Sequence, residues 1–196
     1  HYLLVIAAIT HIAGTFTYVR NTLLGRTQPN RVTFFLWGVI PMIAVAAGIS
    51  EGAWWALLPV FMSGVGPLLT FFASFVNRKA YWKLGTIDLV CGGLAVLAII
   101  LWQITDEPML AVVCAILADG LATYPTLLKA WRQPGTETGV IYIIALVESI
   151  IGLFALSAFT FSEYGFLLYL VLINVLLSFA VYRSDPLKKL KAEFAR

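Results

Sequence analysis

The sequence predicts an all-α integral membrane protein with seven transmembrane helices. Hydrophobic residues make up 61% of the 196-residue chain and charged residues only 12%, whereas soluble domains carry roughly 25% charged residues. A mean hydropathy of +0.91 places most of the chain in hydrocarbon. Seven apolar runs each approach the roughly 20 residues that a helix needs to cross a bilayer. The runs do not show the alternating pattern that is typical of a membrane β-barrel.

Taken in chain order, each predicted span is an apolar run that ends at a connection containing charged or helix-breaking residues. A backbone inside the bilayer has no water to bond with, so runs of this length are expected to be helical. The connections combine glycine, proline and charged residues, which end helices. The predicted spans are residues 2–24, 31–49, 54–76, 82–102, 109–130, 139–159 and 164–182. The connections with the clearest breakers are residues 25–29, 50–52, 77–79, 106–108 and 133–135.

The basic residues all fall on one side of the predicted bundle. The 13 Lys and Arg residues flank the first, third and fifth connections or follow the last span. The opposite connections carry Glu51, Asp106, Glu107 and Glu163. Cytoplasmic loops are enriched in Lys and Arg, so we expect the N-terminus outside, the C-terminus in the cytoplasm and the chain in a bacterial inner (plasma) membrane. The residues after Arg183 are expected to form a short basic segment at the membrane surface.

Residues 13–37 and 119–142 repeat one order of residues. Both contain glycine, tyrosine, a Leu-Leu pair, Gln-Pro, threonine and an aromatic residue, and aligning them needs a one-residue gap. The matched positions are Gly14 and Gly120, Tyr18 and Tyr124, Pro29 and Pro134, Thr33 and Thr138, and Trp37 and Tyr142. Internal repeats are typical of membrane transporters. Shared composition is the alternative explanation, because many membrane hairpins combine apolar, basic and Gln-Pro residues.

The repeat and the number of spans together predict two parallel three-helix bundles. The first and fifth spans both run from outside to inside, so the fourth span must invert the chain. We expect a first bundle over residues 1–77, a linker helix over residues 78–106, a second bundle over residues 107–183 and a basic cytoplasmic tail over residues 184–196. In this 3+1+3 arrangement the solute site lies near the midplane between the bundles.

This layout resembles the SWEET sugar transporters and the wider proline-glutamine-loop (PQ-loop) family. The resemblance covers nearly the whole chain as an arrangement of helices, and Pro125-Thr126 stands where the family has Pro-Gln. It implies hinge prolines, for which Pro41 and Pro125 are the matching positions. It also implies a substrate-binding asparagine in the seventh helix, for which Asn174 is the match. Some members of the family couple export to protons through an aspartate within a helix.

Three ionisable residues, Asp119, Glu148 and His11, fall near the middle of the fifth, sixth and first spans. Ionisable groups inside a membrane are costly and mark functional sites. We interpret Asp119 as the first candidate for proton coupling or solute binding, Glu148 as a carboxylate able to share its proton, and His11 as a group that titrates near neutral pH. The alternative for each is an interhelical hydrogen bond, with His11 bonded to a carboxylate such as Asp119.

Asn174, Trp37 and Tyr142 complete the candidate site. Asn174 lies at mid-depth in the last span, where an asparagine either contacts solute or links two helices. Trp37 and Tyr142 hold matched positions in the repeat and can stack on a sugar ring or a cation. Anchoring at the membrane interface is the alternative role for these two aromatic residues.

These observations predict a SWEET-like transporter of a small polar solute (a sugar, an amino acid or a related metabolite) that works by alternating access, with proton coupling through Asp119 or Glu148. The alternative is a non-transporting receptor or accessory membrane subunit, because the Pro-Gln signature is altered and only half of the hinge prolines are present. The expected partners are the solute, the lipid bilayer and further copies of the chain, without nucleic acid. Catalytic and metal-binding motifs are missing from the sequence, so we expect neither a cofactor nor a metal nor enzymatic activity.

Overall fold

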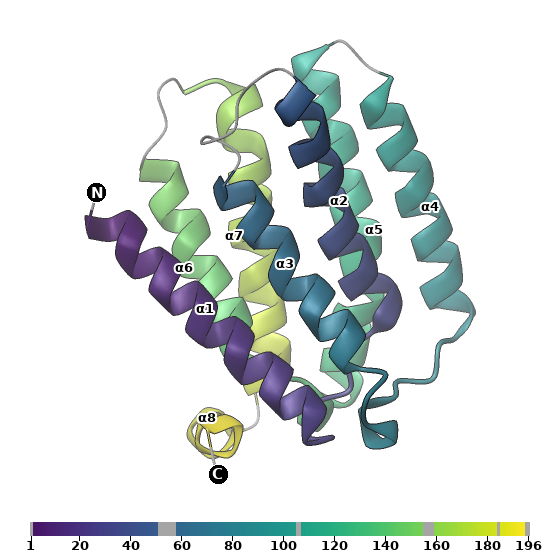
Figure 1. Ribbon diagram of the computed structural model, residues 1–196, viewed down its shortest axis with the longest axis vertical. Helices are drawn as coiled ribbons and strands as arrows, with labels where there is room; N and C mark the ends of the chain where they lie inside the picture. The colour runs from purple at the N-terminus through teal and green to yellow at the C-terminus, as the bar shows by residue number, and fades with distance from the viewer. Residues whose placement is uncertain (1, 51–57, 105–106, 155–158, 184, 195–196) are drawn as a thin grey trace.

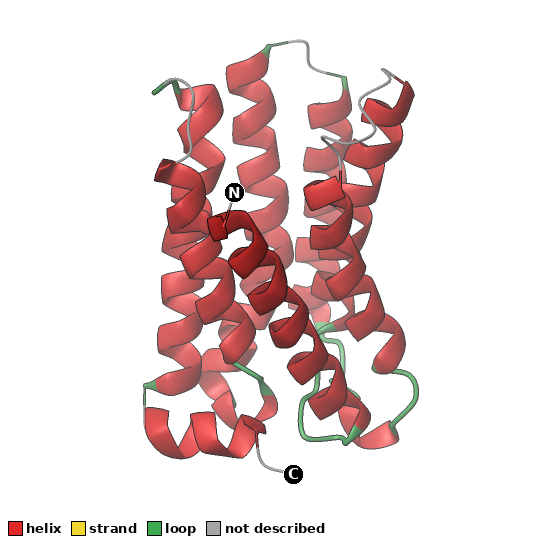
Figure 2. Cartoon of the chain, turned by 60° about the vertical axis from the view of Figure 1, so that its left-hand side comes forward, coloured by secondary structure: helices red, strands yellow, loops and turns green. Residues whose placement is uncertain are grey.

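The computed structural model describes residues 2–50, 58–104, 107–154, 159–183 and 185–194, and its regular structure there is all helical. Long helices form a bundle, and one short helix lies across an end of it (Figure 1, Figure 2). The helices are α1 Tyr2–Leu23, α2 Arg31–Ser50, α3 Leu58–Ala73, α4 Thr86–Gln103, α5 Pro108–Arg132, α6 Val140–Phe154, α7 Phe161–Tyr182 and α8 Pro186–Phe194. Two 3-10 turns, η1 Arg78–Ala80 and η2 Pro134–Thr136, lie in connections. The predicted all-helical class is confirmed for the described residues.

Three of these helices are long and apolar enough to cross a membrane, by length and composition: Thr86–Gln103, Met109–Arg132 and Glu163–Tyr182. Shorter apolar helices are Arg31–Ile43, Phe61–Ala73 and Val140–Phe154. Large apolar side chains point outward over much of the bundle, for example Phe72 (63% exposed) and Phe179 (57% exposed). Soluble monomers rarely expose continuous apolar surface of this kind. The structure is therefore compatible with a membrane protein.

The start of α4 differs from the predicted span by four residues. The span was expected to begin at residue 82, whereas the helix begins at Thr86. The side chain of Asp88 accepts a hydrogen bond from the backbone N–H of Gly85 at 2.5 Å, which fixes the first turn at this point. The predicted span segments 54–57 and 155–158 lie outside the described residues.

The connection between α1 and α2 is shaped by one glycine and one asparagine. Gly25 has a φ of +71° just after α1, a left-handed conformation that favours glycine at the end of a helix. Asn30 begins α2, because its side-chain oxygen accepts hydrogen bonds from the backbone N–H groups of Val32 (3.1 Å) and Thr33 (3.3 Å). These two residues fix the backbone on either side of the Gln-Pro connection.

The basic tail is a helix, which the sequence prediction missed. Asp185 precedes α8, and its carboxylate accepts a hydrogen bond from the backbone N–H of Lys188 at 3.0 Å. Pro186 occupies the first helical position. An acidic N-cap followed by proline is a recognised start of a helix, so the local chemistry explains why this short polar segment folds.

The two halves of the chain share one order of helix packing. In the first half α3 packs against both α1 and α2, and in the second half α7 packs against both α5 and α6. The halves meet through α1 against α6 and through α2 against α5, and α4 packs along α5 while also touching α2 (Figure 1). Each half therefore contributes its first and second helices to the contact with the other.

Small residues bring the helices together in the core. One cluster joins α2, α4 and α5, and the other joins α5, α6 and α7. Small residues allow close approach of membrane helices, where packing replaces the hydrophobic effect as the main attraction. Gly64 on α3 is one such position, because an added Cβ there would lie 2.9 Å from the backbone oxygen of Gly38 on α2. The first cluster is Leu36, Ala95, Ala98, Ile99, Ala118 and Ala122, and the second is Ala130, Tyr142, Leu177, Ala180 and Val181.

One end of the bundle gathers the basic residues of the described chain. Helices α1, α3, α5 and α7 end there, and α8 lies across it (Figure 1). The connections 24–30, 74–85 and 133–139 lie at the same end. We refer to it as the basic end.

Candidate site between the two halves

Asp119 on α5 is hydrogen-bonded to α7 and to its own helix. The hydroxyl of Tyr169 on α7 donates to Asp119 Oδ2 at 2.6 Å, and the hydroxyl of Thr123 donates to the same oxygen at 3.3 Å. The indole N–H of Trp37 on α2 donates to Thr123 Oγ1 at 3.2 Å. These four side chains, which we call the Asp119 cluster, connect α2 of the first half with α5 and α7 of the second.

His11 on α1 pairs with Glu148 on α6. Nδ1 of His11 lies 3.1 Å from Oε2 of Glu148, and both side chains are half-buried. Nε2 of His11 is buried and has no hydrogen-bond partner among the described residues. The expected pairing of Asp119 with Glu148, and of His11 with Asp119, differs from this arrangement. The reason is that His11 and Glu148 lie in the α1–α6 contact, whereas Asp119 lies beside the α2–α5 contact.

Glu137 is the centre of a buried network at the basic end. Its Oε1 lies 2.5 Å from Nζ of Lys129, and its Oε2 accepts hydrogen bonds from the hydroxyls of Tyr18 (2.6 Å) and Tyr142 (2.9 Å). The Lys129 side chain is 1% exposed and the Glu137 side chain 0%. Lys129 also donates to the backbone carbonyl of Gln28. Burying two charges is tolerable only when their remaining lone pairs and protons are satisfied in this way.

The two Gln-Pro connections of the repeat lie against each other. The backbone N–H of Gln28 donates to the carbonyl oxygen of Thr136 at 2.9 Å. The hydroxyls of Thr27 and Thr138 are 2.5 Å apart, and the side-chain amide of Asn21 donates to Thr138 Oγ1 at 3.2 Å. We call this assembly the latch: connections 24–30 and 133–139 with the side chains of Tyr18, Asn21, Lys129 and Tyr142.

The repeat-matched threonines each contact the opposite half. Thr33, at the start of α2, donates to the carbonyl oxygen of Ala122 on α5 at 2.6 Å and accepts from the hydroxyl of Thr126 at 2.9 Å. Thr138, just before α6, accepts from Asn21 on α1. A matched pair of sequence positions thus makes a matched pair of contacts, which composition alone does not explain.

Helix α8 covers the latch through Glu193. The carboxylate accepts hydrogen bonds from the backbone N–H groups of Gly139 (2.7 Å) and Val140 (3.0 Å) and from the hydroxyl of Tyr182 (2.9 Å). A carboxylate at the start of α6 also interacts favourably with the helix dipole. Burial raises the pKa of Glu193 above its usual range, and the hydrogen bonds from Gly139, Tyr182 and Val140 oppose that shift only in part.

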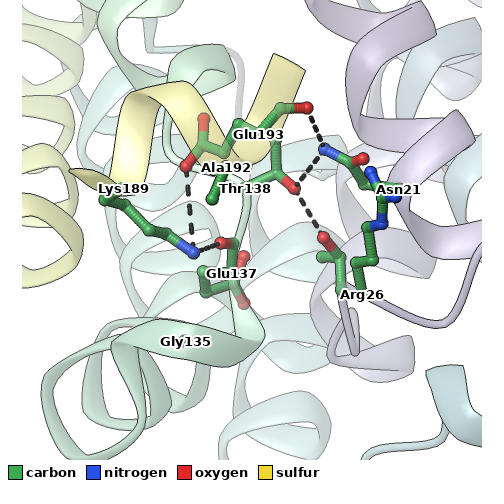
Figure 3. Close-up of a pocket in the computed structure, with 9 residues that line it drawn as sticks. Asn21, Arg26, Gly135, Glu137, Thr138, Lys189, Ala192 and Glu193 are labelled. Carbon is green, nitrogen blue, oxygen red and sulfur yellow. Dashed lines mark hydrogen bonds and ion pairs between the residues drawn. The ribbon is translucent and has the colours of Figure 1, made fainter. Parts of the chain in front are cut away.

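The same helix bridges the two halves (Figure 3). Asn21 of the first half donates to the backbone carbonyl of Glu193 at 2.9 Å, and Nζ of Lys189 donates to the backbone carbonyl of Glu137 in the second half at 2.5 Å. Burial lowers the pKa of Lys189, although the nearby Glu193 charge acts in the opposite direction. A pocket of about 250 Å³ lies between these residues.

The remaining predicted site residues lie in different surroundings. Asn174, which is buried in α7, donates to the carbonyl oxygen of Leu170 on the same helix at 2.8 Å. Tyr142 belongs to the latch and not to the Asp119 cluster, whereas its repeat partner Trp37 does belong to that cluster. Pro41 lies within α2 and Pro125 within α5, and both helices continue past them. Their role as hinges stays a prediction.

Several residues of the site were not found from the sequence. Lys129 was predicted to flank a connection, but the structure buries it. Glu137 is an acidic residue in a basic connection, next to the repeat-matched Thr138, and this contrast of charge was a usable signal. Tyr169 and Thr123 stand in apolar spans, where nothing in the sequence distinguishes them from packing residues.

Among the described residues, no group of three His, Cys, Asp or Glu side chains is placed to hold a metal ion. The geometry therefore offers carboxylates, hydroxyls, an imidazole and an indole as the groups able to bind a ligand or a proton. No protein-family model, curated protein or solved structure was found to match the chain.

Proposed function

We propose that the chain is a SWEET-like membrane transporter of a small polar solute, with seven spanning helices and the basic end in the cytoplasm. The observation that carries the proposal is the way the two halves meet, α1 against α6 and α2 against α5, with a polar cluster in each contact. Parallel repeats of this kind place a solute site between the halves in known transporters. The two halves would rock against each other to expose that site alternately.

The groups between the halves suit a solute that carries hydroxyl or amino groups. The Asp119 cluster combines a carboxylate, two hydroxyls and an indole N–H at the α2–α5 contact. Nε2 of His11 adds one unfilled hydrogen-bonding position at the α1–α6 contact. A few polar groups among apolar side chains are the usual composition of a small-molecule site, and here the two contacts would supply those groups together.

We base the proposed proton coupling through Asp119 on the hydrogen bonds that its carboxylate accepts. Both Tyr169 and Thr123 donate to one oxygen of the Asp119 carboxylate. A proton on the other oxygen, Oδ1, would leave both of these bonds in place and would change Oδ1 from an acceptor into a donor. A solute that donates a hydrogen bond to Oδ1 would then compete with the proton for that oxygen, and this competition would couple transport to protons.

The latch indicates which side of the transporter would be closed. It joins the two Gln-Pro connections at the basic end, and the bonds between Gln28 and Thr136 and between Thr27 and Thr138 cross from one half to the other. Access from the basic end would require these bonds to be exchanged for bonds to water. We therefore assign the described conformation as closed at that end.

The first test is a thermal-stability screen of the purified protein against sugars, amino acids and vitamins at two pH values. A ligand present at about 100 times its dissociation constant stabilises the folded state by about 2.7 kcal/mol. We expect one solute class to raise the melting temperature by an amount that depends on pH in the wild type, and Asp119→Asn to retain the rise but to lose its pH dependence. Glu107→Gln, which alters an exposed carboxylate far from the site, should keep it.

Transport is then measured in proteoliposomes with the solute that the screen finds. Asp119→Asn should abolish flux driven by a pH gradient while leaving counterflow exchange of the solute intact, because exchange needs binding but no net proton movement. A solute that binds without any counterflow would favour a receptor or accessory subunit. If no solute class stabilises the protein at either pH, the proposal fails.

A further inference from the structure

Helix α8 presents a continuous apolar stripe to its surroundings. Leu187 is 71% exposed, Leu190 37% and Phe194 54%. Side chains three or four residues apart lie on one face of a helix, so these three form a single row. Lys188 and Lys191 are also exposed and flank it. Of the described helices, α8 is the most amphipathic.

The opposite face of α8 is held by the protein. Glu193 is anchored at the start of α6, and Lys189 reaches the backbone of Glu137. Residues 189 and 193 are four apart, so both bonds fix one face of the helix against the latch. The rotation of α8 about its own axis is therefore set, and the apolar row must point away from the latch.

The position of α8 places this row at the level where a membrane ends. The helix begins four residues after α7, a helix long and apolar enough to cross a bilayer. It lies across the end of the bundle instead of continuing along its axis (Figure 1, Figure 2). Short amphipathic helices with Lys on the polar side and Leu or Phe on the other lie in the plane of the membrane interface.

We propose that the exposed face of α8 binds the anionic headgroup layer of the membrane. Leu187, Leu190 and Phe194 enter the boundary of the acyl chains, while Lys188 and Lys191 contact lipid phosphates. Charge complementarity selects an anionic surface, because the basic residues of the described chain gather at this end. The proposal depends on membrane insertion of the bundle and not on transport. Two lysines near an anionic surface favour the docked helix by roughly 30-fold.

The test measures the depth of α8 in lipid nanodiscs. A nitroxide is attached at Leu190→Cys in the full chain, with Cys91 and Cys114 replaced by alanine, and the discs contain either phosphatidylcholine alone or 30% phosphatidylglycerol. Collisions with oxygen report on lipid, and collisions with a water-soluble nickel chelate report on water. We expect the oxygen-to-nickel ratio to rise when phosphatidylglycerol is present. Lys188→Gln/Lys191→Gln should abolish most of this rise, because it removes the roughly 30-fold preference.

The matched control is Lys79→Gln/Lys83→Gln, which removes the same charge from exposed residues of another connection at the basic end. It should leave the lipid dependence intact. The proposal is overturned if the oxygen-to-nickel ratio is the same with and without phosphatidylglycerol. It is also overturned if both double variants lose the phosphatidylglycerol-dependent rise equally. Solute flux measured in the same preparations tests the proposed transport function separately from the docking of α8, since a chain without transport can still show lipid-dependent docking of α8.

Discussion

The buried ion pair in the latch gives the sharpest prediction about stability. Replacing Glu137 with glutamine removes the carboxylate charge that lies 2.5 Å from the Lys129 ammonium, whose side chain is 1% exposed. Breaking a buried pair by removing one partner costs roughly 3–5 kcal/mol. Glutamine keeps one acceptor for Lys129, so we expect a loss of about 3 kcal/mol, the low end of that range. For a chain of this length this corresponds to a fall in melting temperature of roughly 6–12 °C.

The assay is thermal unfolding of the detergent-purified protein, followed by intrinsic tryptophan fluorescence. The informative comparison is Lys129→Met/Glu137→Gln, which removes both charges and should melt above the Glu137→Gln single variant, because no isolated charge remains buried. Glu107→Gln, which changes an exposed carboxylate, should leave the melting temperature nearly unchanged. The reasoning is refuted if Glu137→Gln melts with the wild type, or if adding Lys129→Met lowers the melting temperature further.

Two further predictions concern the surroundings of the latch. Because burial raises the pKa of Glu193 in the folded state, the folded protein holds this proton more tightly than the unfolded chain, so stability should fall as the pH rises from about 4.5 through the raised pKa. A melting curve measured at several pH values should show this slope in the wild type and a weaker one in Glu193→Gln. Gly139→Ala should destabilise the fold by roughly 1–3 kcal/mol, because the new Cβ would lie 2.6 Å from a ring carbon of Tyr182. Gly135→Ala, where a Cβ meets nothing within 4 Å, is the matched control in the same denaturation series and should be close to neutral.

The helices were predictable from sequence because apolar length is a local property of the chain. The start of α4 and the existence of α8 were not predicted, although both have local causes. Asp88 fixes the start of α4 by accepting a hydrogen bond from the backbone N–H of Gly85. Asp185 followed by Pro186 starts α8. Hydropathy is insensitive to such caps, because they consist of polar residues that lower the apolar score of the segment they stabilise.

The site was predictable only as far as single residues stand out from their surroundings. Asp119 and Glu148 were selected as candidates because a carboxylate inside an apolar span is costly. Their partners were not, because the rotation of each helix about its axis decides whether Glu148 meets His11 or Asp119. That rotation is set by packing between helices that are distant in sequence. The internal repeat was a better guide to contacts between the halves. It matched Thr33 with Thr138, and each of these threonines bonds to a residue of the other half.

The distribution of charge in the latch bears on how such a molecule could open. Lys129 and Glu137 both belong to the second half, so the buried charges can move together without being separated. The bonds that cross between the halves mostly join neutral groups, as between Thr27 and Thr138 or Gln28 and Thr136. Exchanging such a bond for one to water changes the free energy by only about 1 kcal/mol, whereas separating buried charges costs several times more. Two bonds to these charges also cross between the halves, from Tyr18 to Glu137 and from Lys129 to the carbonyl oxygen of Gln28. Parting the connections would therefore keep the ion pair intact but would cost these two charge-assisted bonds, which are stronger than bonds between neutral groups.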